Sequence, residues 1–269
     1  FPLEKWKMAK SIQTSVSLLL ILILVSLFVK EALAKYYVFE NEAYKSRLFG
    51  ISPIRYPIKA TAFLKENKID GNILNNFYCG SYLIWGLYPE KKVFIDGRTE
   101  LYGPKFYKYY RNALEDEELF KNLLSKYDVN AVLFFDPAKE PQQCITWLLK
   151  SPDWKIVYFD DMSVIFIKFD SPNYDIIAKY GIQLDDIQTE KPVNIIAGSG
   201  DVYPYRYLNK GKLLALAGFF DKAEEEAKIA ISISKKDASA YNLLGAIYLS
   251  KGDFNAAIAI FKQAINARL

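Results

Sequence analysis

The feature that most constrains this chain is a run without charged residues near its N-terminus. Residues 11–29 carry no charge, and their centre, Leu18 to Val25, is entirely aliphatic. A helix of about 19 residues comes close to crossing the ~30 Å hydrocarbon layer of a bilayer. We therefore predict a transmembrane helix at residues 12–33, which with its flanks occupies residues 1–35 and anchors the chain to a membrane.

A secretory signal is the alternative interpretation of the same segment. Met8 could start such a signal, and Ala32-Leu33-Ala34 has the small-x-small form of a cleavage site, although seven residues precede Met8. Three lysines before the run and two after it favour a cytoplasmic N-terminal side. Both interpretations place residues 36 onward outside the cytoplasm, in the periplasm or at the cell surface, with one visible span.

The composition excludes several classes of function. The 269 residues include no histidine, which removes Ser-His and Cys-His nucleophile pairs and histidine-ligated metals. Cys79 and Cys144 are too few for a zinc site; they are either one disulfide or two buried thiols. A net charge of +4 without a Lys/Arg-rich block argues against nucleic acid. We expect no metal and no cofactor.

Residues 56–170 alternate short apolar runs with helical patterns, after a tether at residues 36–55. Strands are predicted at 71–76, 91–97 and 130–135, and a closing hairpin covers 154–169 with its turn at Asp160-Asp161. Helical patterns fill the intervals. This order predicts an α/β class domain with a mixed, mainly parallel sheet, followed by a linker at residues 171–202.

Polar residues follow two of these strands and form a candidate ligand site. Asn75 and Asn76 end the first, and Asp96 and Arg98 end the second. Ligands bind where the carboxyl ends of parallel strands meet. We therefore expect these four residues, with Tyr82 and Trp85 nearby, to line one crevice that holds a sugar or a phosphate.

A structural role is the alternative for the same residues. Asp96 would then cap the next turn, Gly97 would supply a positive φ, and Arg98 would neutralise a carboxylate such as Glu100. The pair Asp160-Asp161 could hold a divalent cation, but a hairpin turn fits it better.

Several short motifs in residues 50–170 resemble a known pattern. They are Pro57, Ala60, Phe63-Leu64, Gly71, Asn75, Gly80, Tyr82-Leu83, Trp85, Pro89, VFIDGR at 93–98 and WKIVYFDDMSVIFIK at 154–168. The order is similar to the soluble region after the last membrane helix of multi-pass proteins related to dolichyl- or polyprenyl-phosphate-mannose–protein mannosyltransferases (GT-C-like). The resemblance implies a glycosyltransferase-like parent whose catalytic core lies upstream. It supplies no catalytic residue to this chain.

Residues 203–269 contain an internal repeat with a period of 34 residues. The matching pairs are Tyr207/Tyr241, Gly211/Gly245, Gly218/Gly252, Phe220/Phe254, Ala223/Ala257 and Ala230/Ala264. The period and the small residues resemble the tetratricopeptide repeat. The first copy is weaker, since Lys210 stands where Leu244 does and Ala227 where Phe261 does.

Such repeats predict a protein partner, with Tyr207, Tyr241, Asn242 and Tyr248 as candidate contacts. The preferred hypothesis is a membrane-anchored, non-catalytic binding and scaffold region of a glycosyltransferase-like membrane protein. One alternative is part of an active glycosyltransferase that uses a lipid-linked sugar. Another is an accessory subunit of a membrane complex.

Overall fold

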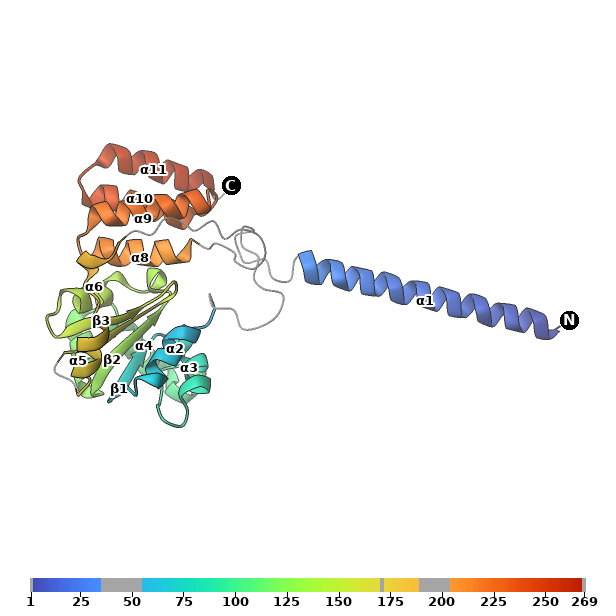
Figure 1. The fold of residues 1–269 in the computed structure, drawn as a ribbon, viewed down its shortest axis with the longest axis horizontal. Helices are drawn as coiled ribbons and strands as arrows, with labels where there is room; N and C mark the ends of the chain where they lie inside the picture. Colours follow the sequence, from blue (N-terminus) through green and yellow to red (C-terminus); the bar gives the residue numbers. More distant parts are fainter. Residues whose placement is uncertain (1, 35–54, 170–171, 189–203, 268–269) are drawn as a thin grey trace. The chain divides into compact units, whose positions relative to one another are not determined.

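A computed structural model describes residues 2–34, 55–169, 172–188 and 204–267 (Figure 1). The chain divides into two compact units, residues 1–50 and 51–269, which are described separately below. The predicted tether at 36–55 lies outside the described residues, apart from Arg55.

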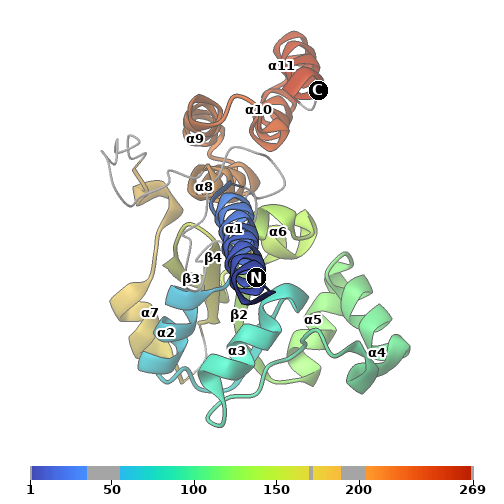
Figure 2. The ribbon, with the colours of Figure 1, turned by 90° about the vertical axis from the view of Figure 1, so that its right-hand side faces the viewer.

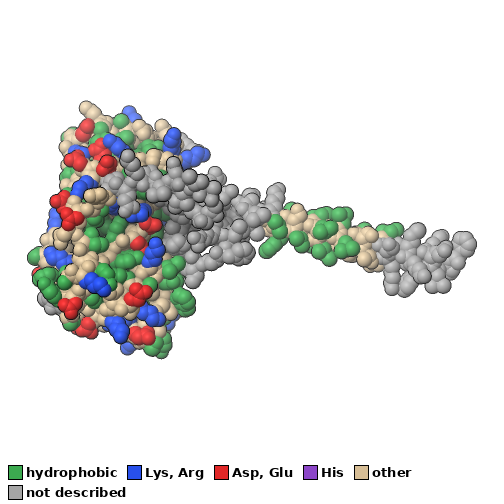
Figure 3. Space-filling view, viewed as in Figure 1, with side chains coloured by type: hydrophobic (Ala, Val, Ile, Leu, Met, Phe, Trp, Pro, Cys, Tyr) green, Lys and Arg blue, Asp and Glu red, His purple; other side chains and the backbone are tan. Residues whose placement is uncertain are grey.

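The first unit contains helix α1, Pro2–Ala34. Its segment Ile12–Val29 has a mean hydropathy of 2.5 and no buried residue. Hydrophobic side chains cover this part of the helix in Figure 3. A continuous helix over an uncharged, aliphatic run confirms the predicted apolar helix. Its length and composition fit a membrane span and fit a signal sequence equally, so both interpretations stay open.

The second unit is built on a four-stranded sheet. Its strands are β1 (Asn72–Asn75), β2 (Val129–Phe135), β3 (Trp154–Phe159) and β4 (Ser163–Lys168), in the order β1-β2-β4-β3. Only β1 and β2 run parallel, whereas β2–β4 and β3–β4 are antiparallel. The predicted mixed α/β class is confirmed. The prediction of a mainly parallel sheet is wrong, because β4 returns from its hairpin and inserts between β2 and β3.

The strand predicted at residues 91–97 does not form. Val93 makes one isolated parallel bridge to Ile73, and no longer ladder follows within the described residues. The physical reason is the side chain of Asn75, which accepts from the N–H of Phe94 at 2.8 Å and donates to the carbonyl of Ile95 at 2.7 Å. These two backbone groups are therefore occupied by a side-chain amide instead of a strand partner.

The β3–β4 hairpin closes as predicted, around Asp160. One carboxylate oxygen of Asp160 accepts from the backbone N–H groups of Met162 and Ser163, at 2.9 and 2.7 Å. The other accepts from the hydroxyl of Tyr158 at 2.6 Å. An aspartate that binds the backbone two and three residues ahead stabilises a tight turn. The geometry therefore favours the turn over a cation site.

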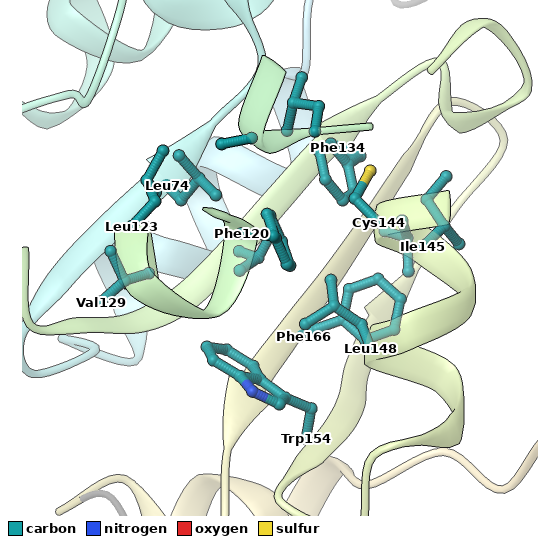
Figure 4. Packing of buried hydrophobic residues seen from close by; sticks show 14 of the residues in the cluster. Leu74, Phe120, Leu123, Val129, Phe134, Cys144, Ile145, Leu148, Trp154 and Phe166 are labelled. Atoms are coloured by element: carbon teal, nitrogen blue, oxygen red, sulfur yellow. The ribbon is translucent and has the colours of Figure 1, made fainter. Parts of the chain in front are cut away.

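Helices cover both faces of the sheet (Figure 2). They are α2 (Ile58–Glu66), α3 (Gly80–Leu87), α4 (Thr99–Ala113), α5 (Glu117–Lys126), α6 (Gln142–Lys150) and α7 (Tyr174–Tyr180), with 3-10 turns at Phe77–Cys79, Pro137–Lys139 and Leu184–Asp186. Alternate residues of β2 point to opposite faces. Val132 and Phe134 join the core cluster of α4, α5 and α6 shown in Figure 4, and Leu133 joins that of α2 and α3.

Part of the predicted linker at 171–202 belongs to this fold. Helix α7 buries Ile177 in the core cluster beneath α2 and α3. Ile182 forms an antiparallel bridge with Ile156 of β3. Residues 189–203 lie outside the described residues. The boundaries between the predicted domains stay predictions, and residues 174–182 pack directly on the sheet.

Two helix pairs follow. They are α8 (Tyr205–Leu216) with α9 (Phe220–Ile233), and α10 (Ala238–Ser250) with α11 (Phe254–Ala267). The repeat predicted these pairs. Gly218 and Gly252, 34 residues apart, have φ angles of 91° and 80° just after α8 and α10. A positive φ ends a helix at low cost when the residue is glycine. The first pair packs on the α/β region, since Leu213 of α8 belongs to the core cluster of Figure 4.

Candidate functional site

Asn75 ends β1 and is fully buried. Its amide nitrogen donates to the carbonyls of Ile95 at 2.7 Å and Asn76 at 2.9 Å, and its oxygen accepts from the N–H of Phe94 at 2.8 Å. The two polar loops that were expected to line one crevice are therefore in direct contact. The amide of Asn75 holds one loop to the other.

Asn76 is also buried and joins β1 to the end of β2. Its amide nitrogen donates to the carbonyl of Phe135 at 2.7 Å and to the Glu140 carboxylate at 2.6 Å. Its oxygen accepts from the N–H of Phe135 at 3.2 Å and from the Cys79 thiol at 2.9 Å. Burial raises the pKa of Glu140. No sequence pattern signalled Glu140, because 64 residues separate it from Asn76.

Asp96 is buried, and its carboxylate accepts four hydrogen bonds. One oxygen receives the backbone N–H of Arg98 at 2.9 Å and its Nε at 2.8 Å; the other receives Nη2 at 2.9 Å and the hydroxyl of Tyr102 at 2.5 Å. These bonds, chiefly those from the Arg98 side chain, hold the pKa of Asp96 well below its usual range. Burial and the bond to Asp96 raise the pKa of Tyr102 to about 12.

This geometry corrects two details of the structural alternative. Arg98 pairs with Asp96 rather than with Glu100. Gly97 does not have a positive φ. The glycine that the close packing requires is Gly80, at the start of α3, where an added Cβ would lie 2.0 Å from the Ile95 carbonyl oxygen. Helix α3 therefore begins directly against the segment that carries Asp96.

Tyr82 and Trp85 lie farther along α3, on its outer side. Tyr82 is partly buried and Trp85 is 70% exposed, with ring centroids 5.3 Å apart. Arg98 is the other accessible member of the predicted site, since 55% of its side chain is exposed. Asn75, Asn76 and Asp96 are buried, so the structure does not bring all six residues to one surface. Ligand binding at these residues stays a prediction, and the geometry favours a structural role for the buried three.

No metal centre forms in the part of the chain that the structure describes. No group of three or more Cys, Asp or Glu side chains there is arranged to hold an ion. Cys79 and Cys144 are both free and buried, which answers the open question of their pairing in favour of thiols. Burial raises the pKa of both thiols, so neither has the character of a reactive cysteine.

The four candidate partner contacts in the repeats differ in accessibility. Tyr207 is buried at 7% exposure. The hydroxyl of Tyr241 donates to the carbonyl of Lys235 at 3.1 Å, and that of Tyr248 donates to the Glu224 carboxylate at 2.9 Å. These three tyrosines help to hold the helices together, and Asn242 alone of the four is exposed.

The exposed residues of α10 form one face, which we call the α10 face; they recur every three or four positions up to Leu249, and Ser250 follows it directly. Its members are Ser239, Asn242, Ala246, Leu249 and Ser250. The equivalent positions of α8 are less accessible. Leu216 packs against the core cluster of the α/β region, and Tyr205 against the cluster beneath α2 and α3. The α/β region therefore covers positions of α8 whose equivalents in α10 are exposed to solvent.

The comparison with protein families gives one match, and it covers the second helix pair. Residues 238–268 match the tetratricopeptide repeat. The search of curated proteins and the search of solved structures each returned no match. Nothing in these comparisons supports the resemblance of residues 50–170 to mannosyltransferase-related membrane proteins. A tetratricopeptide repeat suggests protein–protein interaction.

Proposed function

We propose that this protein is a membrane-anchored binding module whose α10 face holds a segment of a partner protein. The observation that carries the proposal is the repeat match at residues 238–268. Exposed Asn242, Ala246 and Leu249 of α10 offer an amide, a small residue and an apolar side chain within that repeat. Such a mixed, solvent-facing surface on a rigid helix pair suits recognition of an extended peptide.

Anchoring and orientation belong to the same proposal. The apolar helix α1 is long enough to cross a bilayer. The lysine count on its two sides, three against two, favours a cytoplasmic N-terminal side and an extracytoplasmic module. Because both native thiols are buried, a thiol reagent is expected to modify a cysteine that is introduced at the surface. A membrane-impermeant maleimide is expected to label a Lys121→Cys variant on intact cells. Labelling only after lysis would show that the module lies on the cytoplasmic side.

A photo-crosslinking amino acid at position 242, introduced into the full chain in its native membranes, tests partner binding. We expect one defined protein adduct from position 242 and the same adduct from position 246. Lys262 is exposed on α11 and is the matched control position, which should give none. An adduct from position 262 but not from 242 would place the partner elsewhere, and no adduct from either α10 position would contradict the proposal.

Catalysis is not part of this proposal. The resemblance to mannosyltransferase-related proteins supplied no catalytic residue. In the VFIDGR motif, Asp96 is buried, and its carboxylate already accepts hydrogen bonds from Arg98 and Tyr102. A glycosyltransferase-like parent rests on the sequence resemblance alone. Peptide mapping of the native polypeptide for hydrophobic segments upstream of Phe1 would test it.

A further inference from the structure

A second surface of the module has a different chemistry from the α10 face. We call it the aromatic face; it consists of Tyr56, Tyr78, Tyr82, Trp85 and Tyr88. Tyr56 is 43% exposed, and Tyr78, Trp85 and Tyr88 are between 70% and 75% exposed. The rings of Tyr56 and Tyr82, and those of Tyr82 and Trp85, have centroids 5.3 Å apart. Exposed apolar side chains that gather in one patch on a protein surface mark interaction sites.

The aromatic face is the outer side of an amphipathic element. Positions 78, 82 and 85 follow each other by four and three residues, which places them on one side of the helical path from Phe77 to Leu87. The other side buries Leu83 and Leu87, at 1% and 2% exposure, in the core cluster beneath α2 and α3. Tyr82 and Trp85 are therefore held on helix α3, which shares a core cluster with the sheet. Hydrophobic side chains show at this edge of the molecule in Figure 3.

The stretch that carries four of the five residues of the face has no charge. Residues 71–89 contain no Asp, Glu, Lys or Arg. Burying α3 among lipid headgroups would therefore not require the removal of a charge from water. Tyrosine and tryptophan combine an apolar ring with a polar tip, and they are the residues enriched where a membrane meets water.

The sequence limits how far this face can lie from the candidate span. Tyr56 follows residues 35–54, the 20-residue segment that starts directly after α1. Even fully extended, that segment reaches at most about 70 Å. We propose that the aromatic face docks in the lipid–water interface of the membrane that α1 anchors. This inference rests on the proposed anchoring and adds a second, reversible contact with the same bilayer.

A glycan is the other occupant that aromatic rings could hold, and the side chains beside the face favour lipid. A sugar site needs a few placed polar groups as well as an apolar platform. Of the polar residues predicted for a ligand site, Asn75, Asn76 and Asp96 are buried and hydrogen-bonded, and the exposed side chain of Arg98 is paired with Asp96. A lipid interface needs no such directed groups.

Spin labels on the full chain in phosphatidylcholine nanodiscs test the proposal. One label is attached at Ser81→Cys, which is exposed on α3 beside the rings, and a control label at Lys121→Cys on α5. A third label at Ile21→Cys reports whether α1 is in the bilayer. Collision with oxygen, which enters lipid, and with a water-soluble nickel chelate is measured at each site.

The expected result is a nickel collision rate at position 81 several-fold lower than at position 121, with oxygen collision raised as at position 21. The double substitution Trp85→Asp/Tyr88→Asp should restore nickel access at position 81. Phe254→Asp, at an aromatic residue of α11 that is 65% exposed, is the matched control and should not.

Two outcomes would overturn the proposal and are distinguishable. The first is a label at position 81 that is as open to nickel as the label at 121 while position 21 is embedded in the bilayer. It would refute the docking and leave the anchoring intact. If position 81 became shielded only after an oligosaccharide was added, the docking would likewise be refuted and the face would be assigned to glycan binding. A label at 21 that is open to nickel would refute the anchoring and the docking together.

Discussion

The two helix pairs of the repeat region share a 34-residue pattern and differ in what fills it. In the second pair, Leu244 and Ile260 occupy positions where the first pair has Lys210 and Glu226. Lys210 Nζ lies 2.6 Å from a Glu226 carboxylate oxygen, and the two side chains are 7% and 0% exposed. The same helix–helix contact is thus apolar in one pair and ionic in the other.

The neighbours of each pair differ as well. The first pair lies between the α/β region and the second pair, and Lys210 also donates to the carbonyl of Gln188 at 2.6 Å. The second pair packs through α10 on α9 and α8, and α11 exposes Phe254, Ile258 and Ile265. The comparison teaches that a repeat pattern specifies the backbone, while residues outside the pattern adapt each copy to its surroundings.

The buried ion pair gives the largest expected effect. Lys210→Leu alone removes the ammonium that is paired with the buried Glu226 carboxylate, which should lower the free energy of unfolding by about 3–5 kcal/mol. The double variant Lys210→Leu/Glu226→Ile copies the second pair and should be neutral or more stable by about 1–4 kcal/mol. Urea unfolding of the full chain in detergent, followed by far-UV circular dichroism, measures both.

A double variant as unstable as the single one would contradict this account. It would mean that the hydrogen bond to Gln188, and not the ion pair, determines the stability of the first pair. Glu226→Ile alone completes the cycle and isolates the coupling between the two side chains.

The sequence predicted backbone elements better than their pairing. Apolar runs located β1, β2 and the β3–β4 hairpin, and the repeat located four helices. Strand direction depends on where β4 inserts, and no local pattern reports that. The missing strand at 91–97 has a similar cause, because the amide of Asn75 binds backbone groups about 20 residues away.

The sequence identified charged residues of the candidate site but not the contacts between them. Asp96 and Arg98 are two residues apart, yet the structural alternative paired Arg98 with Glu100, because spacing alone does not report which carboxylate a side chain reaches. Tyr102, near the start of α4, donates a hydrogen bond to the Asp96 carboxylate. Glu140 accepts one from Asn76, which lies 64 residues away in the sequence. Lys210 was recognised as an exception in the repeat, but its partner Glu226 lies on the next helix and could not be located without the fold.

Gly211 of α8 and Gly245 of α10 are equivalent glycines that test how tightly each helix pair packs. A Cβ on Gly245 would lie 2.7 Å from the ring of Phe261, so Gly245→Ala should cost about 1–3 kcal/mol through overpacking. On Gly211 the nearest atom is the flexible end of Leu243 at 3.0 Å. Gly211→Ala should change stability by less than about 1 kcal/mol, since alanine also favours the helix by about that amount.

Relief of the clash is the control. Phe261→Leu combined with Gly245→Ala should recover part of the stability, and unfolding in urea measures it. Equal losses of unfolding free energy from Gly211→Ala and Gly245→Ala would show that the two helix pairs pack alike. That result would contradict the view that Phe261 makes the second pair tighter than Ala227 makes the first.

The contact between the pairs should respond to acid. Glu224 lies 2.6 Å from Lys228 and 2.5 Å from Lys251, and hydrogen bonds from these lysines lower the pKa of Glu224 to about 2. An unfolded glutamate has a pKa of about 4.3. The stabilisation is therefore complete above that value and is lost as the pH falls toward 2. Because the ion pairs lie near solvent, we expect about 1 kcal/mol or less.

Unfolding measured between pH 5 and 2 (about the range set by these two pKa values) checks this prediction. Glu224→Gln should flatten that part of the profile, whereas Glu225→Gln, an exposed neighbour on α9, should leave it unchanged. Equal profiles for the wild type and Glu224→Gln would remove Glu224 from the account of how the two pairs join.

Ile258 of α11 should give the smallest effect, although it is the repeat equivalent of Glu224. The α9 surface around Glu224 is covered by α10, but Ile258 is 54% exposed. Ile258→Glu should therefore change the free energy of unfolding by no more than about 0.5 kcal/mol. A loss well above that, measured by the same urea titration, would mean that another helix covers α11 as α10 covers α9. The difference between the two pairs would then lie in their sequence alone and not in their surroundings.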